Sequence, residues 1–263
     1  VPDAGLPTSE TGMRHRTAER VSRQTGALVV SVSQRRDVVT LYRGGEKIIL
    51  EDVVVLLAKA NQALQTLTGY RNRLDEIASH LTALEFQDAV TVGAVVAVIQ
   101  RTGMLLRVAR ELARYIAELG SEGRLVRMQV DQIMASVESG LTLLLKDYCP
   151  SDRRAVVTAA RGHVDELTSE QLLDSLTVAE ILGLGHSTDV LEMHVSPRGY
   201  RQLGQIPMLP SAVVGRLVER FGNLPNLLQA DVSHLDKVDG VGERRARAIR
   251  ESLAGVRERA IGA

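Results

Sequence analysis

The sequence predicts an α+β protein that is mostly α-helical and built from three parts. Apolar residues recur every three or four positions between residues 51 and 144, as in helices with one buried stripe. Residues 27–42 instead alternate in the manner of β-strands. Near the C-terminus, a Gly-x-Gly sequence separates two helix-compatible segments. We therefore expect a partial mixed α/β domain (residues 1–50), a central helical bundle or spine (residues 51–195) and a C-terminal helical domain (residues 196–263).

Composition restricts the kind of ligand site that we expect. The chain has 263 residues, enough for two or three domains with their own cores. Its formal net charge is zero, so any anion-binding site must come from local clusters of cations and not from a global field. Only 3% of the residues are aromatic and tryptophan is absent, which argues against recognition of single strands by base stacking.

The single cysteine and the lengths of the apolar runs predict a cytoplasmic protein without a membrane partner. One cysteine, Cys149, excludes an internal disulfide and fits a reducing compartment. It lies beside Pro150 without neighbouring ligand residues, so we expect an incidental or buried thiol. Runs such as residues 53–58 are too short to span a bilayer, and no signal peptide is recognisable. His186 and His194 are too isolated to suggest zinc.

A basic triplet near the N-terminus predicts a phosphate site. Arg14, His15 and Arg16 follow Gly12 and begin a helix-compatible stretch that stops at Gly26. The first turn of a helix leaves backbone N–H groups unpaired and carries the positive end of the helix dipole, so it attracts anions. Arginine adds planar donors that can hold phosphate through two hydrogen bonds. The alternative is a solvated basic helix start.

The alternating stretch predicts a β-hairpin at the edge of the first domain. Residues 27–33 and 37–42 read as its strands, with polar residues 34–36 between them and Gly44-Gly45 closing it. Ser31 and Ser33 lie on one face of the first strand, from which their hydroxyls could reach a ligand. The alternative is that small hydroxyl residues fit a crowded strand.

Three amphipathic segments predict the central bundle or spine. They begin near residues 53, 92 and 126, and residues 85–88 and 120–123 separate them. We expect this part to space and orient its neighbours. The stripes fit an ordinary intramolecular core, and a coiled-coil dimer is the alternative.

The bundle ends at a polar, proline-containing break, and shorter helices follow it. Residues 150–154 form the break, and a helix over residues 169–176 is expected to have Ser169 as its cap. Residues 177–180 have capping-box spacing and lead to a glycine break at residues 183–185. Residues 196–200 read as a linker or turn.

The C-terminal Gly-x-Gly predicts contact with DNA backbone. In the pattern of a helix-hairpin-helix motif, Gly240-Val241-Gly242 permits a tight connection and exposes N–H groups where a phosphate can approach. Lys237, Arg244 and Arg245, with Arg247, supply cations. Residues 206–218 look like a degenerate first copy, and residues 221–224 lead to a helix around Leu227. The tandem pair resembles the DNA-binding domains of junction-processing proteins, and a purely structural hairpin is the alternative.

Taken with the strands, the basic triplet resembles part of a known catalytic domain. Residues 11–18, 30–36 and 39–42 are similar to the second half of a diadenylate cyclase domain, and the likeness to bacterial DNA-integrity-scanning diadenylate cyclases extends over the whole chain. The resemblance implies condensation of two ATP into cyclic di-AMP and pyrophosphate with Mg²⁺ or Mn²⁺. It implies catalytic roles for Arg14, His15 and Arg16, and nucleotide contacts from these three with Thr11, Gly12, Thr17, Ser31 and Ser33.

The resemblance also implies an assembly and a regulatory partner. Members of the family form homo-octamers with paired catalytic domains. Double-stranded and branched DNA, such as a four-way junction, binds at the hairpins and represses the cyclase. The spine transmits this effect from the hairpins to the catalytic domain. These expectations follow from the family and not from residue spacing.

One signature of the family has no counterpart here. Its Asp-Gly-Ala motif, whose aspartate holds the metal, precedes the basic triplet in the family, whereas Asp3-Ala4-Gly5 has the wrong order and Asp239-Gly240-Val241 belongs to the hairpin. We therefore expect that the chain begins inside the catalytic domain and does not cyclise ATP by itself. A non-enzymatic DNA-binding module is the first alternative, and a structural scaffold is the second.

Overall fold

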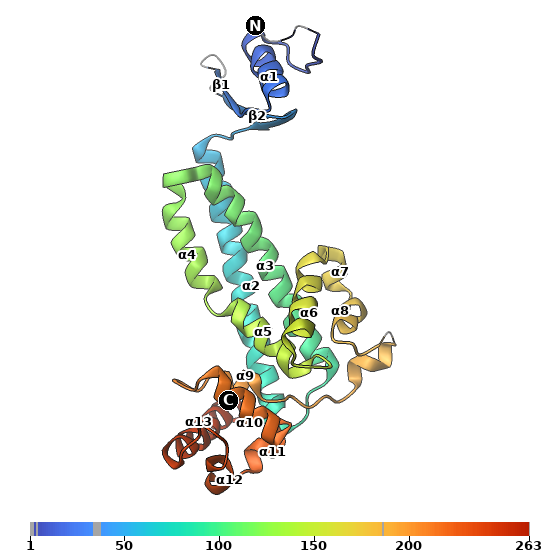
Figure 1. Ribbon diagram of the computed structural model, residues 1–263, viewed down its shortest axis with the longest axis vertical. Coiled ribbons are helices and arrows are strands. Elements are labelled where there is room, and N and C mark those ends of the chain that lie inside the picture. Colours follow the sequence, from blue (N-terminus) through green and yellow to red (C-terminus); the bar gives the residue numbers. More distant parts are fainter. Residues whose placement is uncertain (1–2, 4, 34–37, 186, 263) are drawn as a thin grey trace. The chain divides into compact units, whose positions relative to one another are not determined.

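The computed structural model describes residues 3, 5–33, 38–185 and 187–262 (Figure 1). The chain divides into two compact units. The first contains residues 1–64 and 112–128, and the second contains residues 65–111 and 129–263. Two long helices, α2 (Val53–Gln87) and α3 (Val92–Leu119), contribute residues to both units.

The first unit begins with one helix and a small antiparallel sheet. Helix α1 (Met13–Thr25) ends as predicted at Gly26, whose φ is 70° and whose N–H donates to the Ser22 carbonyl at 2.8 Å. Strands β1 (Val29–Ser33), β2 (Val38–Arg43) and β3 (Glu46–Ile49) follow in the order β1-β2-β3. The helix and the first two strands confirm the prediction. The predicted polar connection at residues 34–36 and the predicted first residue of the second strand, Asp37, lie outside the described residues.

The third strand is a correction to the predicted hairpin. Gly44 and Gly45 have φ angles of 57° and 103°, which most L-residues avoid. The pair therefore turns the chain back to form β3 instead of ending the sheet. The turn also packs near α1, because the Gly44 N–H donates to the Ser22 hydroxyl at 3.1 Å.

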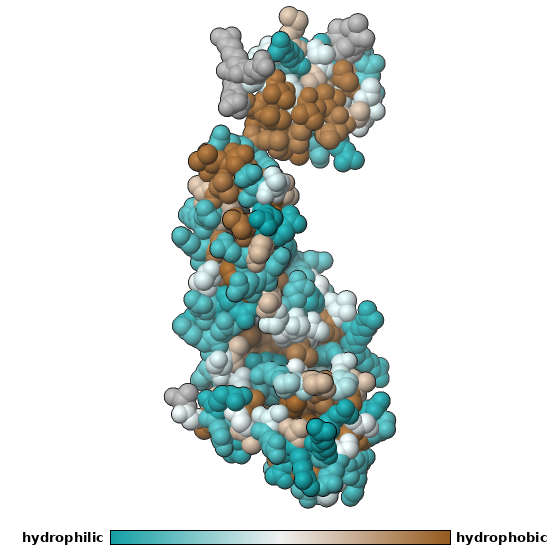
Figure 2. Space-filling model, turned by 90° about the vertical axis from the view of Figure 1, so that its left-hand side faces the viewer, coloured by the Kyte–Doolittle hydropathy of each residue, from teal (hydrophilic) through white to brown (hydrophobic). Residues whose placement is uncertain are grey.

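The two faces of the sheet differ in polarity. Partners across the strands share a face, so Ser31 lies with Thr40, and Val30 lies with Leu41. The face with Ser31 and Thr40 points toward α1. The opposite face is apolar, and its Val30, Val32 and Ile48 are each more than half exposed. Figure 2 shows apolar side chains gathered on this part of the molecule.

The long helices have the predicted stripes, with one correction at the end of α2. In the second unit, Leu67, Leu74 and Leu81 of α2 are buried at seven-residue spacing. Helix α2 continues through residues 85–87, which we predicted to be a break, and the chain turns at Asp88 with φ 51°. The reason is that both residues are buried: Glu85 continues the stripe one turn after Leu81, and Phe86 packs into the core of the C-terminal helices.

The third predicted helical segment is two helices. The short 3₁₀ helix η1 (Gly120–Gly123) confirms the separator before it, and α4 (Arg124–Met134) and α5 (Val137–Tyr148) then replace one continuous helix. Ser136 between them has φ 65°. Arg71 of α2 donates to the carbonyls of Ile133 and Ala135 at 2.8 and 3.0 Å. A side chain from another helix thus satisfies the carbonyls at the end of α4.

Helices α6 (Arg154–Glu166), α7 (Ser169–Leu173) and α8 (Ser175–Ile181) follow the predicted break, and η2 (Thr188–Glu192) comes after the glycines. The predicted helix over residues 169–176 is wrong in its extent, because Asp174 separates α7 from α8. The caps also differ from the prediction. Thr168 caps α7 in a capping box with Gln171, one residue before the predicted cap. Asp174 caps α8, so Thr177 lies inside that helix and not at its start. The Asp174 carboxylate accepts two N–H bonds there, which a hydroxyl cannot do as well.

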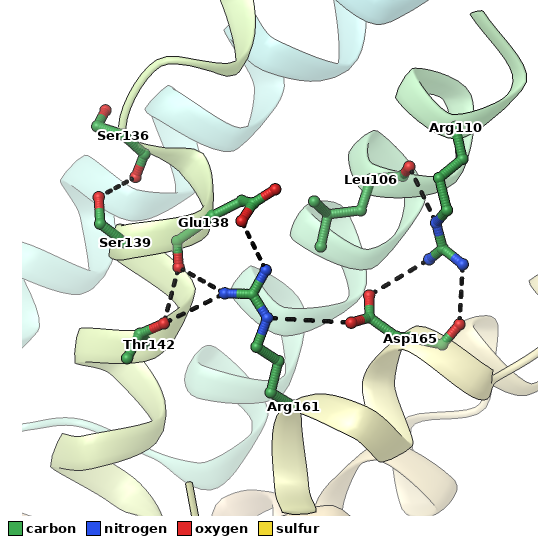
Figure 3. Close-up of polar contacts among 8 residues, drawn as sticks. All are labelled: Leu106, Arg110, Ser136, Glu138, Ser139, Thr142, Arg161 and Asp165. Atoms are coloured by element: carbon green, nitrogen blue, oxygen red, sulfur yellow. Dashed lines mark hydrogen bonds and ion pairs between the residues drawn. The ribbon is translucent and has the colours of Figure 1, made fainter. Parts of the chain in front are cut away.

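A network of arginines and carboxylates joins three of these helices (Figure 3). Arg161 of α6 binds Glu138 of α5 at 2.9 Å and the Thr142 hydroxyl at 3.3 Å. Arg110 of α3 contacts the carboxylate and the carbonyl of Asp165 at 3.4 and 3.1 Å. The side chains are partly exposed, so each pair contributes modestly to stability.

The stretch Val92–Tyr148 is long and apolar enough, by length and composition, to hold a membrane span. We had predicted no such span. Half of its apolar window is buried inside the protein, and the core helix of a globular domain passes the same test.

Five short or medium helices form one C-terminal core: α9 (Tyr200–Gly204), α10 (Ser211–Phe221), α11 (Leu224–Gln229), α12 (Val232–Asp236) and α13 (Glu243–Ile261). Leu203, Leu217, Leu235 and Ile249 are buried at its centre. Phe86 of α2 packs into the same cluster. The C-terminal helices and the end of α2 therefore share a core (Figure 1).

Residues 196–200, which we predicted to be a linker or turn, form a fixed junction. The buried Asp147 carboxylate accepts the N–H groups of Gly199, Tyr200 and Arg201 at 2.7, 2.6 and 2.8 Å. Arg198 donates in return to the carbonyls of Lys146 and Asp147 at 2.8 and 2.9 Å. These reciprocal bonds attach the start of α9 to the end of α5.

A second buried carboxylate reinforces this junction. Glu85 of α2 pairs with Arg201 at 2.6 Å and accepts the Tyr148 hydroxyl at 2.7 Å. Gln202 also donates to it, while the Gln202 Oε1 atom has no partner among the described residues. Removing one partner from such a cluster leaves a buried charge without compensation, so each member is costly to replace.

Burial and, to a smaller extent, the nearby Glu85 carboxylate raise the pKa of Asp147, and the N–H groups of Arg201 and Tyr200 lower it, with the net result that it lies at about 7. The folded protein thus holds a proton that the unfolded chain releases above about pH 4. Stability from this group is fully present below pH 4 and is lost as the pH rises through 7.

We predict that Asp147→Asn destabilises the second unit by about 2–4 kcal/mol, because the amide NH₂ would face N–H donors. Asparagine does not titrate, so the gap between the wild type and the variant should narrow by about 1 kcal/mol per pH unit between pH 4 and 7. Urea unfolding at several pH values measures this difference in the free energy of unfolding. Other titrating groups affect both proteins equally, so their contributions cancel in the difference. A gap that widens with pH would show that folding lowers the pKa of Asp147.

Candidate functional site

The N-terminus of α1 is open to a ligand. Its cap residue, Gly12, makes no side-chain hydrogen bond, and the first turn holds no acidic residue. The φ and ψ of Gly12 are −87° and 137°, which any residue can adopt, and a Cβ there would meet only His15 at 3.9 Å. Glycine is therefore not needed for folding at this position. Its lack of a side chain leaves the unpaired N–H groups of the first turn accessible.

The two predicted arginines differ in their contacts. Arg14 is exposed, and among the described residues it makes no hydrogen bond or ion pair. Arg16 donates to the carbonyls of Glu10 and Thr11, both at 3.4 Å, and so is not neutralised by a carboxylate. Thr11 is exposed, whereas the Thr17 hydroxyl donates to the Met13 carbonyl at 2.9 Å. The cationic charge at the start of α1 is therefore available to an anion.

His15 is held by a chain of polar side chains that the sequence analysis missed. The Tyr42 hydroxyl donates to Glu10 at 2.9 Å and lies 3.1 Å from Nδ1 of His15. A hydroxyl has one proton, so Tyr42 accepts from the Nδ1–H of His15. In neutral His15 this leaves the Nε2 lone pair free to bind a proton donor or a metal.

Charged side chains continue this hydrogen-bonded network toward β3. Lys47 pairs with Glu10, and this hydrogen bond lowers the pKa of the Glu10 carboxyl. Burial raises the pKa of Tyr42, and its bond to Glu10 adds to the effect. Tyr42 therefore remains a neutral hydroxyl across the physiological range. Tyr42 lies opposite Val29 on the polar face of the sheet. The alternation of side chains along the strand was the feature of the sequence that could have indicated this position.

Ser31 and Ser33 share the sheet face that carries Tyr42, as their alternation predicted. Ser31 is buried and Ser33 is half-buried. The face is lined by small hydroxyl side chains, including buried Thr40. Contact of these hydroxyls with a nucleotide stays a prediction.

A second candidate site lies in two helix–loop–helix units of the same geometry, α9–α10 and α12–α13. In the first loop Ile206 N–H donates to Leu203 and Leu209 N–H donates to Ile206. In the second loop Val238 donates to Leu235 and Val241 donates to Val238, each 32 positions later. The predicted degenerate first copy thus has the backbone arrangement of the second.

The two glycines of the second loop have different roles. Gly240 has φ 83°, and a Cβ there would lie 3.0 Å from an Arg216 nitrogen and 3.2 Å from Val213, so any other residue is strained at this position. Gly242 has φ −82°, and nothing lies within 4 Å of its Cβ position. It caps α13 without a side chain and leaves the first N–H groups of that helix open. The sequence pattern alone treats the two glycines alike.

The predicted cations of this loop are only partly free. Lys237 and Arg244 are exposed without a partner among the described residues. Arg245 donates to the Gly240 carbonyl, and Arg247 pairs with Glu243. Val241, which we grouped with the DNA-binding residues, has a buried side chain and a bonded N–H, so it supports the loop from inside.

The described residues contain no group of three His, Cys, Asp or Glu side chains that could hold a metal ion. His194 bonds the carbonyl of Asp88 at 2.9 Å instead, and His186 lies outside the described residues. Cys149 is buried, as expected, and burial raises the pKa of its thiol to about 11.

Comparison with known proteins places this geometry in a family. Residues 50–191 match the linker region of the DisA bacterial checkpoint controller, and residues 3–47 match its nucleotide-binding region. This chain belongs to the DisA family. The predicted resemblance is thereby confirmed, and all the predicted nucleotide residues lie inside the matched nucleotide-binding region. The two loops lie after both matched regions.

Several DisA relatives are similar over nearly the whole chain. Proteins named DNA integrity scanning protein DisA from Symbiobacterium thermophilum, Streptomyces avermitilis and Carboxydothermus hydrogenoformans are 51%, 50% and 49% identical to it. The alignments cover 98%, 99% and 98% of this chain, and 72%, 71% and 73% of the relatives.

We predict that Tyr42→Phe destabilises the α1–sheet contact by about 1–2 kcal/mol, because it removes one hydrogen bond from His15 and one from Glu10. Amide hydrogen exchange of α1 and β2 measures the change. Tyr70→Phe is the matched control, since the Tyr70 hydroxyl has no hydrogen-bond partner within the described residues. If amide exchange of α1 and β2 is the same in both variants, the hydrogen bonds of Tyr42 do not stabilise this contact, contrary to the prediction.

Proposed function

We propose that this chain is the nucleotide-binding and DNA-binding part of a diadenylate cyclase, which condenses two ATP into cyclic di-AMP and pyrophosphate. The match to the DisA nucleotide-binding region supports the first activity. The observation that carries it is the open start of α1, where Arg14 and Arg16 are not paired with carboxylates. Unpaired N–H groups and two guanidinium groups at one helix end suit a polyphosphate.

In the proposed reaction, a ribose 3′-hydroxyl attacks an α-phosphate and pyrophosphate leaves. Negative charge on two facing nucleotides opposes this approach, so the roles of Arg14 and Arg16 are to screen it and to stabilise the charge that develops. His15, oriented by Tyr42, presents Nε2 to a phosphate, a hydroxyl or a metal. Thr11, Gly12, Thr17, Ser31 and Ser33 complete the proposed nucleotide contacts.

The proposed metal, Mg²⁺ or Mn²⁺, has no carboxylate cage among the described residues. Glu10 is engaged by Lys47 and Tyr42, and buried Glu19 is engaged by Arg23. The residues described here therefore do not fit a resident ion. A divalent ion of this kind usually keeps contacts to substrate phosphates, and we propose that it arrives with ATP.

We predict that Arg14→Ala weakens ATP binding between about 10- and 100-fold, because it removes charge-assisted hydrogen bonds to phosphate. Isothermal titration measures the affinity. Arg43→Ala is the control of equal charge, because Arg43 ends β2, beside the turn that contacts the last part of α1. If Arg43→Ala weakens binding as much as Arg14→Ala does, the ligand responds to net charge and not to this site.

Incubation of the chain with ATP and Mn²⁺ tests the catalytic step. We propose that it binds ATP and forms no cyclic di-AMP, because its sequence has no counterpart of the Asp-Gly-Ala motif. Product formed by this chain alone would show that the motif is not required.

The second proposed activity is binding of double-stranded and branched DNA, including four-way junctions, at the C-terminal loops. The name of the relatives is consistent with DNA scanning. Residues 237–250 carry five cations and two anions, and the start of α13 has no side-chain cap. A phosphate can therefore approach the N–H groups beside Gly242 closely, with Lys237 and Arg244 near it. Gly240 and Val241 hold the loop, and Arg245 closes over it.

We predict that Gly242→Ala folds normally and weakens DNA binding about 10-fold, since its Cβ would stand between the N–H groups and a phosphate. Lys237→Ala should lower the number of counterions released on DNA binding by about one, which reduces the dependence of the affinity on salt. Fluorescence anisotropy at several salt concentrations measures both, and Arg257→Ala is the charge-matched control. Unchanged affinity of Gly242→Ala at unchanged stability would remove this loop from the interface.

The remaining features of the proposal come from the family. We propose a cytoplasmic homo-octamer in which DNA at the loops represses the cyclase through the helical spine. The three parts predicted from the sequence, residues 1–50, 51–195 and 196–263, correspond in this proposal to catalysis, coupling and DNA binding.

A further inference from the structure

The two loops share a backbone arrangement but offer different chemistry. With the 32-residue offset, Met208 takes the place of Gly240 and Pro210 takes the place of Gly242. Pro207 and Pro210 have no N–H groups, so the first loop cannot hold a phosphate through those amides as the second loop can. What it offers at its tip is the side chain of Met208.

Met208 is unusual in both its conformation and its exposure. Its φ is 59°, in the left-handed region where a non-glycine side chain is strained. The side chain is 96% exposed, the highest value among the exposed large hydrophobic residues described. An apolar side chain that stays in water on a strained backbone does not stabilise the fold. Its chemistry therefore points to a contact outside the chain.

The position of Met208 shows which partner such a contact would involve. Ile206, Pro207, Met208 and Leu209, from the first loop, line a groove of about 630 Å³. Gly242, Arg244, Arg245 and Ala248, from the second loop and the first turns of α13, line the same groove. The apolar tip and the open start of α13 thus face one groove, so a DNA held at Gly242 has Met208 beside it.

We propose that Met208 is an apolar wedge that packs against unstacked base faces at branched or distorted DNA, while the Gly242 loop holds the neighbouring phosphate. The inference rests on the proposed DNA binding. Regular duplex keeps its base faces stacked, whereas a branch point exposes them or makes their separation easier. Methionine is among the side chains that proteins insert between base steps. The first loop supplies preference for DNA shape, and the second supplies affinity.

Met208→Gly tests the wedge without a folding penalty. Glycine suits a φ of 59°, so the variant should be at least as stable as the wild type in thermal unfolding. We expect its preference for a four-way junction over duplex of equal length to fall about 10-fold, with duplex affinity unchanged. Met208→Leu keeps an apolar side chain and should retain the preference. Met193→Ala, at a methionine that is 51% exposed, is the control.

A spectroscopic readout separates insertion from general binding. With 2-aminopurine beside the branch point, the wild type should raise its fluorescence on binding and Met208→Gly should not, because unstacking relieves quenching. Full preference and full fluorescence in Met208→Gly would overturn the wedge, even if Gly242→Ala still loses affinity. If the wild type binds neither junction nor duplex, the proposed DNA function fails and the wedge fails with it.

Discussion

The placement of the C-terminal helices depends on one buried carboxylate. Asp147, at the end of α5, accepts three consecutive N–H groups at the start of α9, and Arg198 returns two bonds to the carbonyls of α5. Since α9 opens the first helix–loop–helix unit, the same bonds position its loop. The ion pair of Arg201 with Glu85 extends the constraint to α2. A segment that the sequence predicts to be a linker is thereby a fixed junction between α5, α9 and α2.

The two C-terminal loops have the same backbone arrangement but different exposed residues at their tips, which suits the proposed nucleic-acid surface. The buried positions, such as Leu203 with Leu235 and Ile206 with Val238, preserve the loop hydrogen bonds in both copies. The exposed positions are not under that constraint, so they can diverge. One copy leaves the amides beside Gly242 open, and the other exposes Met208. In the proposed DNA complex, affinity and shape preference are therefore separate properties of the two loops.

The first unit uses polarity to assign its two sheet faces. Tyr42, Thr40 and Ser31 face α1, and the Tyr42 hydroxyl orients His15 while Glu10 and Lys47 keep it in place. Val30 and Val32 of β1 face the other way and are exposed. The polar face is thus the one that a phosphate ligand at the start of α1 can use.

The sequence by itself determined where the helices, two strands and the charged helix starts lie, because apolar periodicity, glycine stops and basic clusters are local properties. It could not separate Gly240 from Gly242, since one needs positive φ beside Arg216 and the other only needs empty space. Nor could it find the break at Ser136, which depends on Arg71 from another helix. Tertiary structure alone decided that Tyr42 meets His15 and that Asp147 meets Gly199, because partners 27 and 52 residues apart are brought together only by packing.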